Sequence, residues 1–367
     1  MVNKTEGGLP MVLKNALLNG NLCDIEIIEG KISAIGKIDK DGIDLNGNRI
    51  YAGLIEIHAH GCIGYDTMDG DKLTEMSVYQ AENGITTWYP TTMTMPVDDV
   101  QHVTDVDLTK VEGANVPGFH LEGPFISMKY KGAQDPEYVI KPDVKIFNSI
   151  KNAKLITIAP EVEGAYDFIK ECNAVVCLGH TDATYDEAVK AFECGAKCLT
   201  HTFNAMPPLH HRNPGVIGAG MMCNGYAQVI GDGLHVHPAA FIALYKMFTS
   251  DRLVIISDTL RAADVPEGEY TLGYQKIIVK DGLARLEDGT IAGSTNNLFK
   301  CVKRVIGFGI DADEAFKMAS LTPAKLMGID DTKGSVEIGK DADLIVVDKN
   351  YDLKMSMVGG KIYKNEL

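Results

Sequence analysis

The sequence has no long hydrophobic run and no targeting segment at its start. None of its apolar runs reaches the roughly 18 to 20 residues that a membrane-spanning helix needs. The beginning of the chain lacks a continuous apolar stretch followed by a cleavage site, which a secretory signal peptide would require. We therefore expect a cytoplasmic protein rather than a membrane-bound or secreted one.

The sequence is also short of positive charge, of paired cysteines and of repeats. Its formal net charge is −15, which disfavours nucleic acids and acidic membranes as partners because both require a basic surface. An anionic substrate must therefore be met by a local positive group. The eight cysteines are scattered without a CxxC pair, so we expect reduced, buried thiols and not disulfides. No solenoid-type repeat is present.

Strand-like and helix-like segments alternate through the middle of the chain, whereas both ends are rich in short strands and glycine turns. A length of 367 residues is ordinary for a barrel with an appended domain. The alternation predicts an α/β fold, with a (β/α)8 barrel over residues 51–334. We expect residues 1–50 and 335–367 to pair into one small β-sandwich domain.

Two histidines stand where neighbouring strands are expected to end. An apolar run over residues 175–178 leads to His180, and a shorter one over residues 198–199 leads to His201. The helix predicted between them can begin at Thr181 or Asp182 and end at Gly195. In an α/β barrel the carboxyl ends of the strands form the active-site rim, so two imidazoles there predict the start of a metal site.

Three more ligand-type residues follow other strand-like runs. The run LIEI leads into His58-Ala59-His60, whose alternate spacing places both imidazoles on one face of a strand. The segment VPGFHLE ends in Glu122, directly before Gly-Pro. This pattern suits divalent metal ligation.

A further carboxylate and a basic loop complete the candidate site. Asp258 follows the apolar run LVIIS, and an unpaired charge buried there would be very costly. We therefore interpret Asp258 as a metal ligand or a proton-transfer group. The loop that contains Asn204 and Arg212 is the most basic segment of this acidic chain, and a planar guanidinium beside an amide is suited to phosphate.

The arrangement of these residues resembles the amidohydrolase superfamily, and within it the N-acetylglucosamine-6-phosphate deacetylase family. The resemblance is carried by seven segments in order: HLEGPF, KGAQDP, GHTDA, HTFNAMPP, HHRNPG, GDGLHVHP and GTIAGST. It extends over nearly the whole chain, including GSVEIGKDADLIVVD near the end. The resemblance implies a metal-dependent barrel enzyme that removes the acetyl group of N-acetylglucosamine 6-phosphate in amino-sugar metabolism.

The resemblance also assigns roles to individual residues. Glu122, His180 and His201 match the main metal site, while His58 and His60 match positions that hold a second metal in some members. One or two divalent metals are implied, with Zn the first candidate and Fe, Co or Mn as alternatives.

Asp258 matches the catalytic aspartate. Substrate contacts are implied for Ala133, Gln134, Asn204, Ala205, Arg212, His235, Ile291, Ala292 and Gly293. The counterpart of Arg212 reaches the neighbouring subunit's site, so the resemblance implies a homodimer.

The chain departs from the family pattern at two places. Thr259-Leu260 follow Asp258 where many members have Ala, and Gln134 stands where some members carry a histidine near the acetyl carbonyl. More of the matching residues therefore support the type of reaction than support the identity of the sugar. Deacetylation of a galactosamine or mannosamine epimer remains an alternative, as do hydrolysis of a cyclic amide and a catalytically inactive scaffold. The cyclic-amide enzymes bridge two metals with a carboxylated lysine, and no strand here ends in a suitable lysine.

Overall fold

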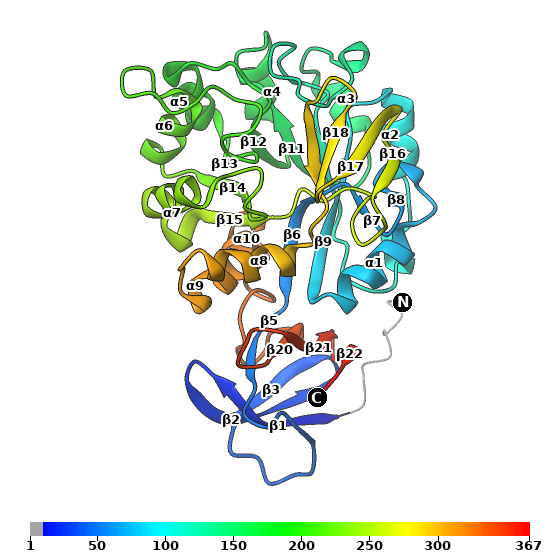
Figure 1. Ribbon diagram of the computed structural model, residues 1–367, viewed down its shortest axis with the longest axis vertical. Helices are drawn as coiled ribbons and strands as arrows, with labels where there is room; N and C mark the ends of the chain where they lie inside the picture. Colours follow the sequence, from blue (N-terminus) through cyan, green and yellow to red (C-terminus); the bar gives the residue numbers. More distant parts are fainter. Residues whose placement is uncertain (1–9) are drawn as a thin grey trace.

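A barrel of parallel strands forms the larger part of the molecule. The computed structural model describes residues 10–367, so the first nine residues of the predicted small domain lie outside the described part of the chain. The barrel strands follow one another in sequence order: β6 (Leu54–Ala59), β9 (Ile85–Thr92), β10 (Phe119–Glu122), β11 (Ala153–Ile158), β12 (Val175–Leu178), β13 (Cys198–Leu199), β14 (Tyr226–Ile230) and β15 (Leu253–Ile256). Figure 1 shows helices around them. The predicted barrel is confirmed.

The barrel closes between its last strand and its first. A bridge pairs Ala59 with Thr259, and the Asp258 N–H donates to the His58 carbonyl at 2.9 Å. Deeper in the seam, the buried Glu56 carboxylate accepts the backbone N–H of Ser257 at 3.1 Å. A carboxylate thus supplies a cross-strand hydrogen bond at this seam.

The helices cover the outside of the barrel and one of them closes its amino-terminal end. Their bounds are α1 (Leu73–Glu82), α2 (Val97–Thr104), α3 (Val144–Ser149), α4 (Ala165–Glu171), α5 (Tyr185–Cys194), α6 (Gly215–Met222), α7 (Pro238–Arg252), α8 (Leu298–Gly307), α9 (Ala312–Met318) and α10 (Leu321–Met327). Large apolar side chains such as Trp88 and Phe241 pack between strands and helices. Ala324 and Leu326 of α10 instead join the core inside the barrel.

Helix α5 begins later than the sequence suggested. Thr184, and not Thr181 or Asp182, is its N-cap, and the Glu187 carboxylate accepts the Thr184 N–H at 2.8 Å. The earlier residues are used elsewhere, because the Thr181 hydroxyl and the Asp182 N–H both donate to Glu161. The helix ends at Gly195, whose φ of 125° is easy for glycine.

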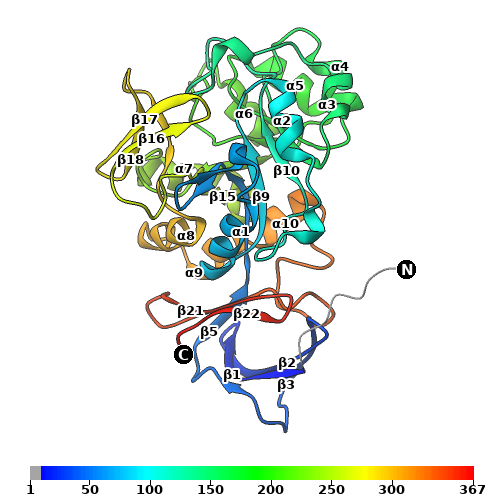
Figure 2. The same cartoon turned by 90° about the vertical axis from the view of Figure 1, so that its right-hand side faces the viewer.

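A curved sheet at the other end of the molecule joins the two ends of the chain (Figures 1 and 2). Its strands are β1 (Met11–Leu18), β2 (Asn21–Ile28), β3 (Lys31–Gly36), β4 (Ile43–Asp44), β5 (Arg49–Ala52), β20 (Leu344–Val347), β21 (Leu353–Val358) and β22 (Lys361–Asn365). Strand β5 lies between β20 and β1. The sheet folds over its own apolar core, which includes Ile25, Ile50 and Val346. The small β-sandwich is confirmed; the division at residues 50/51 and 334/335 stays our proposal.

A second antiparallel sheet follows the last barrel strand. It contains β16 (Gly268–Leu272), β17 (Gln275–Lys280), β18 (Leu283–Leu286) and β19 (Ile291–Ser294). The local sequence pattern predicts only one hairpin here, over residues 270–287. Two short strands, β7 (Gly61–Cys62) and β8 (Tyr65–Asp66), pair after β6. No helix within residues 10–367 is both long and apolar enough to span a bilayer.

Candidate metal centre and active site

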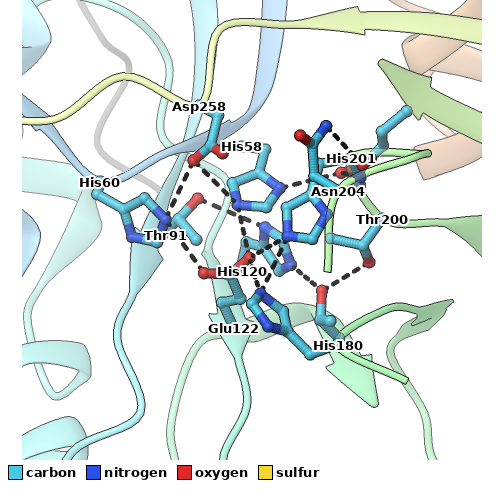
Figure 3. Close-up of polar contacts among 12 residues, drawn as sticks. His58, His60, Thr91, His120, Glu122, His180, Thr200, His201, Asn204 and Asp258 are labelled. Carbon is cyan, nitrogen blue, oxygen red and sulfur yellow. Dashed lines mark hydrogen bonds and ion pairs between the residues drawn. The ribbon is translucent and has the colours of Figure 1, made fainter. Parts of the chain in front are cut away.

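Four imidazoles surround one carboxylate at the carboxyl end of the barrel (Figure 3). The Nε2 atoms of His58, His180 and His201 lie 3.1, 3.2 and 3.0 Å from Glu122 Oε1. His60 Nε2 lies 3.2 Å from the other oxygen, Glu122 Oε2. Two potential metal groups result, His58–His60–Glu122 and Glu122–His180–His201, with Glu122 common to both.

The hydrogen bonds on the far side of the rings fix which nitrogens can bind a cation. His58 Nδ1 faces the Gln228 Oε1 acceptor at 3.0 Å, and His180 Nδ1 faces the Tyr130 carbonyl at 2.9 Å. In the neutral rings the Nδ1 atoms must therefore donate, which leaves the Nε2 lone pairs directed at Glu122. His180 Nε2 also lies 3.0 Å from His201 Nε2.

These converging lone pairs would repel one another and the carboxylate unless a cation lay between them. All four histidines and Glu122 are at least nine-tenths buried, so water cannot screen the repulsion. Imidazole nitrogen and carboxylate oxygen are ligands that divalent transition metals accept. The residues present therefore fit a divalent metal.

Asp258 faces the same point from the opposite side. Its Oδ1 lies 3.4 Å from His60 Nε2 and 3.6 Å from His58 Nε2. Burial alone would raise the pKa of Asp258, but His58 and His60 lower it below its usual range. Asp258 is therefore held as a carboxylate beside the ligand cluster.

The backbone at three of these residues lies in the left-handed region. The φ angles of His180, His201 and Asp258 are 47°, 26° and 49°. Such angles cost a non-glycine residue roughly 1–2 kcal/mol, so the surrounding hydrogen bonds must stabilise them. Each residue is the second one after the end of a short parallel strand, where this turn of the backbone directs the side chain over the barrel mouth.

Gln134 supports Glu122 and does not point away toward solvent. Its Nε2 donates to Glu122 Oε2 at 2.6 Å, and its Oε1 accepts the Thr94 N–H at 2.7 Å. The backbone donor at Thr94 fixes the orientation of the amide, because the carboxamide oxygen must face that N–H. Gln134 is 2% exposed, so both bonds are shielded from water.

A cavity of about 280 Å³ opens beside the cluster. It is lined by the following predicted site residues: His60, Glu122, Ala133, Gln134, Asn204, Ala205, His180, His201, His235, Asp258, Ile291, Ala292 and Gly293. The last three belong to β19, so the second antiparallel sheet forms one wall. Met93, Leu272 and Thr290 also line the cavity and were not anticipated.

Arg212 lies outside this cavity. Its side chain is exposed and lines a separate hollow with residues such as Asp182 and Tyr185. Within residues 10–367, no Lys or Arg lines the cavity beside the metal cluster. The part of the chain described here therefore places no fixed positive side chain there for a phosphate.

His235 presents a free nitrogen to the cavity. Its Nδ1 donates to Asp232 Oδ2 at 2.6 Å, while its buried Nε2 has no hydrogen-bond partner within residues 10–367. Burial alone would lower the pKa of His235, but Asp232 raises it above its ordinary value. His235 Nε2 is therefore available to a ligand, as an acceptor in the neutral ring and as a donor in the imidazolium.

Several residues that hold the ligand histidines in place were not predicted from the sequence. Gln228 orients His58, and His120 packs against the His58 ring with centroids 4.6 Å apart. His120 Nε2 contacts the Thr157 hydroxyl at 2.8 Å, which contacts the Thr200 hydroxyl at 2.8 Å. The available signal was a polar residue at alternate positions of an apolar strand, because such a side chain points into the barrel.

The sequence and the fold of the chain are both similar to those of known deacetylases. The chain is 36% identical over 360 residues to N-acetylglucosamine-6-phosphate deacetylase of Vibrio furnissii, covering 94% of this chain and 88% of that protein. It is 34% identical over 354 residues to N-acetylgalactosamine-6-phosphate deacetylase of Escherichia coli O157:H7, covering 92% and 94%. The crystal structure of N-acetylglucosamine-6-phosphate deacetylase from Pasteurella multocida superposes with a TM-score of 0.91 at 30% identity, covering 97% and 100%.

A family model also matches most of the chain. The model described as "Amidohydrolase family" matches residues 49–363, which include the whole barrel and every predicted site residue. With this match and with relatives above 30% identity over most of its length, the chain belongs to the amidohydrolase family.

Proposed function

We propose that the protein hydrolyses the acetamido group of N-acetyl-D-glucosamine 6-phosphate, giving D-glucosamine 6-phosphate and acetate. The observation that carries the proposal is the convergence of Glu122, His180 and His201 opposite Asp258 at the wall of a cavity. A divalent metal held by these ligands would lower the pKa of a water molecule and polarise the acetyl carbonyl. Zinc is the first candidate, and His58 and His60 provide ligands for a second ion.

Asp258 is the proton carrier of the proposed reaction. As an ionised carboxylate it takes a proton from the attacking water, and it then transfers that proton to the departing amine. The amine leaves more easily as its conjugate acid, so one residue serves both halves of the hydrolysis. Its position within 3.6 Å of His58 and His60 supports this role.

The remaining cavity residues hold the sugar and its phosphate. His235 Nε2 and the Asn204–Ala205 segment border the cavity and offer donors to the ligand. Arg212 lies too far from its own chain's cavity to line it. We propose that the enzyme is a cytoplasmic homodimer in which Arg212 of each subunit binds the phosphate in the neighbouring site, so that remote binding positions the amide.

A second candidate substrate is N-acetylgalactosamine 6-phosphate. The relative from E. coli O157:H7 that bears this activity in its name is nearly as similar to the chain as the V. furnissii protein is. The two substrates differ only in the configuration of one hydroxyl group, and the metal ligands do not discriminate between them. Specificity must therefore come from the cavity wall.

Acetate release tests both candidates. Purified protein is assayed with the 6-phosphates of N-acetylglucosamine, N-acetylgalactosamine and N-acetylmannosamine, and with unphosphorylated N-acetylglucosamine, each with and without a chelator. We expect the highest kcat/KM with N-acetylglucosamine 6-phosphate and loss of activity on chelation. Activity that survives exhaustive metal removal would contradict the metal-dependent mechanism, and equal kcat/KM on the unphosphorylated sugar would remove phosphate from the substrate.

A further inference from the structure

A second large hollow lies at the amino-terminal end of the barrel, away from the metal cluster. Its volume is about 730 Å³, which falls in the range of pockets that hold small organic ligands. It is bordered by the starts of the barrel strands, by the end of α4 and by α10. The proposed deacetylation does not use it.

Four lysines from separate elements line this hollow. Lys154 lies on β11, Lys170 on α4, Lys197 directly before β13 and Lys325 on α10. No Asp or Glu of residues 10–367 lines the hollow, although acidic residues outnumber basic ones 50 to 35 in the chain. The hollow is therefore a local positive site on a negatively charged protein.

Most of the positive charge there is not neutralised by ion pairs. Lys170 lies 3.5 Å from Asp167, but Lys154, Lys197 and Lys325 have no carboxylate within 4.0 Å among residues 10–367. Asp251 forms its ion pair with Lys317 at 2.8 Å, and Lys325 contributes less to the lowered pKa of this carboxyl than Lys317 does. Three ammonium groups are thus free to meet an anion.

A buried tyrosine gives an independent indication of a ligand. Tyr89 points into the barrel, lines the hollow and is only 2% exposed. Its backbone carbonyl accepts a hydrogen bond from Thr91, but its hydroxyl has no partner among the described residues. The hydroxyl oxygen itself keeps contact with the open space of the hollow, so a ligand there can donate a hydrogen bond to it or accept one from it.

Apolar residues complete the wall. Leu326, Met327 and Ile329 lie on or just after α10, and Ile169 and Val175 lie opposite on α4 and β12. The combination of ammonium groups, a phenol and aliphatic side chains suits an anion that has an organic body as well as negative charge. Lysine binds phosphate as a mobile point charge.

We infer that this hollow is a binding site for a small phosphorylated organic anion, distinct from the active site. The inference does not rest on the proposed reaction, because no residue of the metal cluster or its cavity takes part. Binding at this end of the barrel leaves the catalytic mouth open, so the ligand would not compete with the substrate for its site.

Calorimetric titration tests the inference. Fructose 1,6-bisphosphate, AMP and inorganic phosphate are titrated separately into the metal-loaded protein. We expect saturable binding of one ligand per subunit for at least one organic phosphate, and weaker binding of inorganic phosphate because it lacks the organic body. Absence of saturable binding for all three probes would overturn the inference.

Two triple variants localise the bound probe. K154A/K197A/K325A removes the unpaired lysines of the hollow, and K37A/K246A/K349A removes three exposed, unpaired lysines elsewhere with the same change in net charge. The first should weaken binding at least about tenfold, while the second should change it less than about twofold. Equal weakening in both variants would mean that only net charge matters and would overturn the inference.

Tyr89→Phe provides a smaller and more specific change. It removes only the unpartnered hydroxyl, so we expect affinity to fall about fivefold if the ligand bonds to it. Circular dichroism and thermal melting of each variant establish that the fold is intact. Unaltered binding by both Tyr89→Phe and K154A/K197A/K325A would place the probe elsewhere and would also overturn the inference.

Discussion

The two ends of the barrel gather opposite kinds of polar group. At the carboxyl end, imidazole lone pairs and the carboxylates of Glu122 and Asp258 face one point. At the amino-terminal end, ammonium groups and the Tyr89 hydroxyl border a hollow that none of the carboxylates in the described part of the chain lines. The first arrangement fits a divalent cation, and the second is the site that we infer for an anion. The same strands run between the two ends. The difference therefore comes from the residues at the start of each strand and from those at or just after its end.

The rigidity of the two sites also differs. Side chains at the carboxyl end are buried and fixed by hydrogen bonds such as His58 to Gln228 and Gln134 to Thr94. The lysines at the other end are exposed and long, and three of the four have no ion-pair partner among the described residues. Buried, preorganised groups suit catalysis, whereas mobile charges suit reversible ligand binding. This contrast predicts a graded series of mutational effects.

The largest effect is expected for Asp258→Asn. The amide keeps the shape of the side chain but cannot accept the proton, so kcat for acetate release should fall about 10²- to 10⁴-fold. Metal content, measured by atomic absorption, should stay unchanged. Asp41→Asn, an exposed change of the same kind, serves as the control. A near-normal kcat would remove Asp258 from proton transfer.

Gln134→Leu should weaken the metal site. Loss of the 2.6 Å hydrogen bond to Glu122 frees that carboxylate to reorient, so metal affinity should fall about 10- to 100-fold. Competition with a chromophoric chelator measures this affinity without any activity assay. Gln275→Leu is the control, because its side-chain amide donates to the Ala133 carbonyl and not to Glu122. Its metal affinity should stay unchanged. If both variants bind metal as tightly as the parent protein, Gln134 does not position Glu122.

Arg212→Ala should act on substrate binding and not on the metal. One lost charge-assisted hydrogen bond to phosphate would raise KM about tenfold. Because Arg212 is outside its own cavity, mixed dimers with Asp258→Asn subunits provide a sharper readout. A dimer of one Arg212→Ala and one Asp258→Asn subunit should contain one site with the KM of the parent protein only if Arg212 acts across the interface. Mixtures no more active than the separate variants would contradict that arrangement.

The smallest effect on turnover is expected at the amino-terminal end. Without a phosphorylated ligand present, K154A/K197A/K325A should change kcat and KM less than about twofold, because surface lysines away from the reacting groups contribute little to the transition state. The acetate-release assay measures both parameters. A large loss of kcat in a correctly folded variant would show that these lysines affect turnover, and would contradict the separation of the two ends.

Much of the barrel could be predicted because its pattern is local. Apolar runs followed by His58, Glu122, His201 or Asp258 mark strand ends, and the carboxyl ends of parallel strands meet at one rim. The predicted α5 start was wrong because Thr181 and Asp182 bind Glu161, a contact between distant segments. The second antiparallel sheet was only partly predicted, since short alternating strands do not show how many neighbours they have.

The sequence by itself determined the order of strands and helices, the ligand types and the family, because these depend on periodicity and on motifs within short segments. Only the tertiary structure decided that Gln134 bonds Glu122, that Arg212 lies outside its own cavity, and that lysines from four elements line one hollow. Each of these depends on distances between residues far apart along the chain. Such distances are set by how the strands and helices pack, which local patterns do not encode.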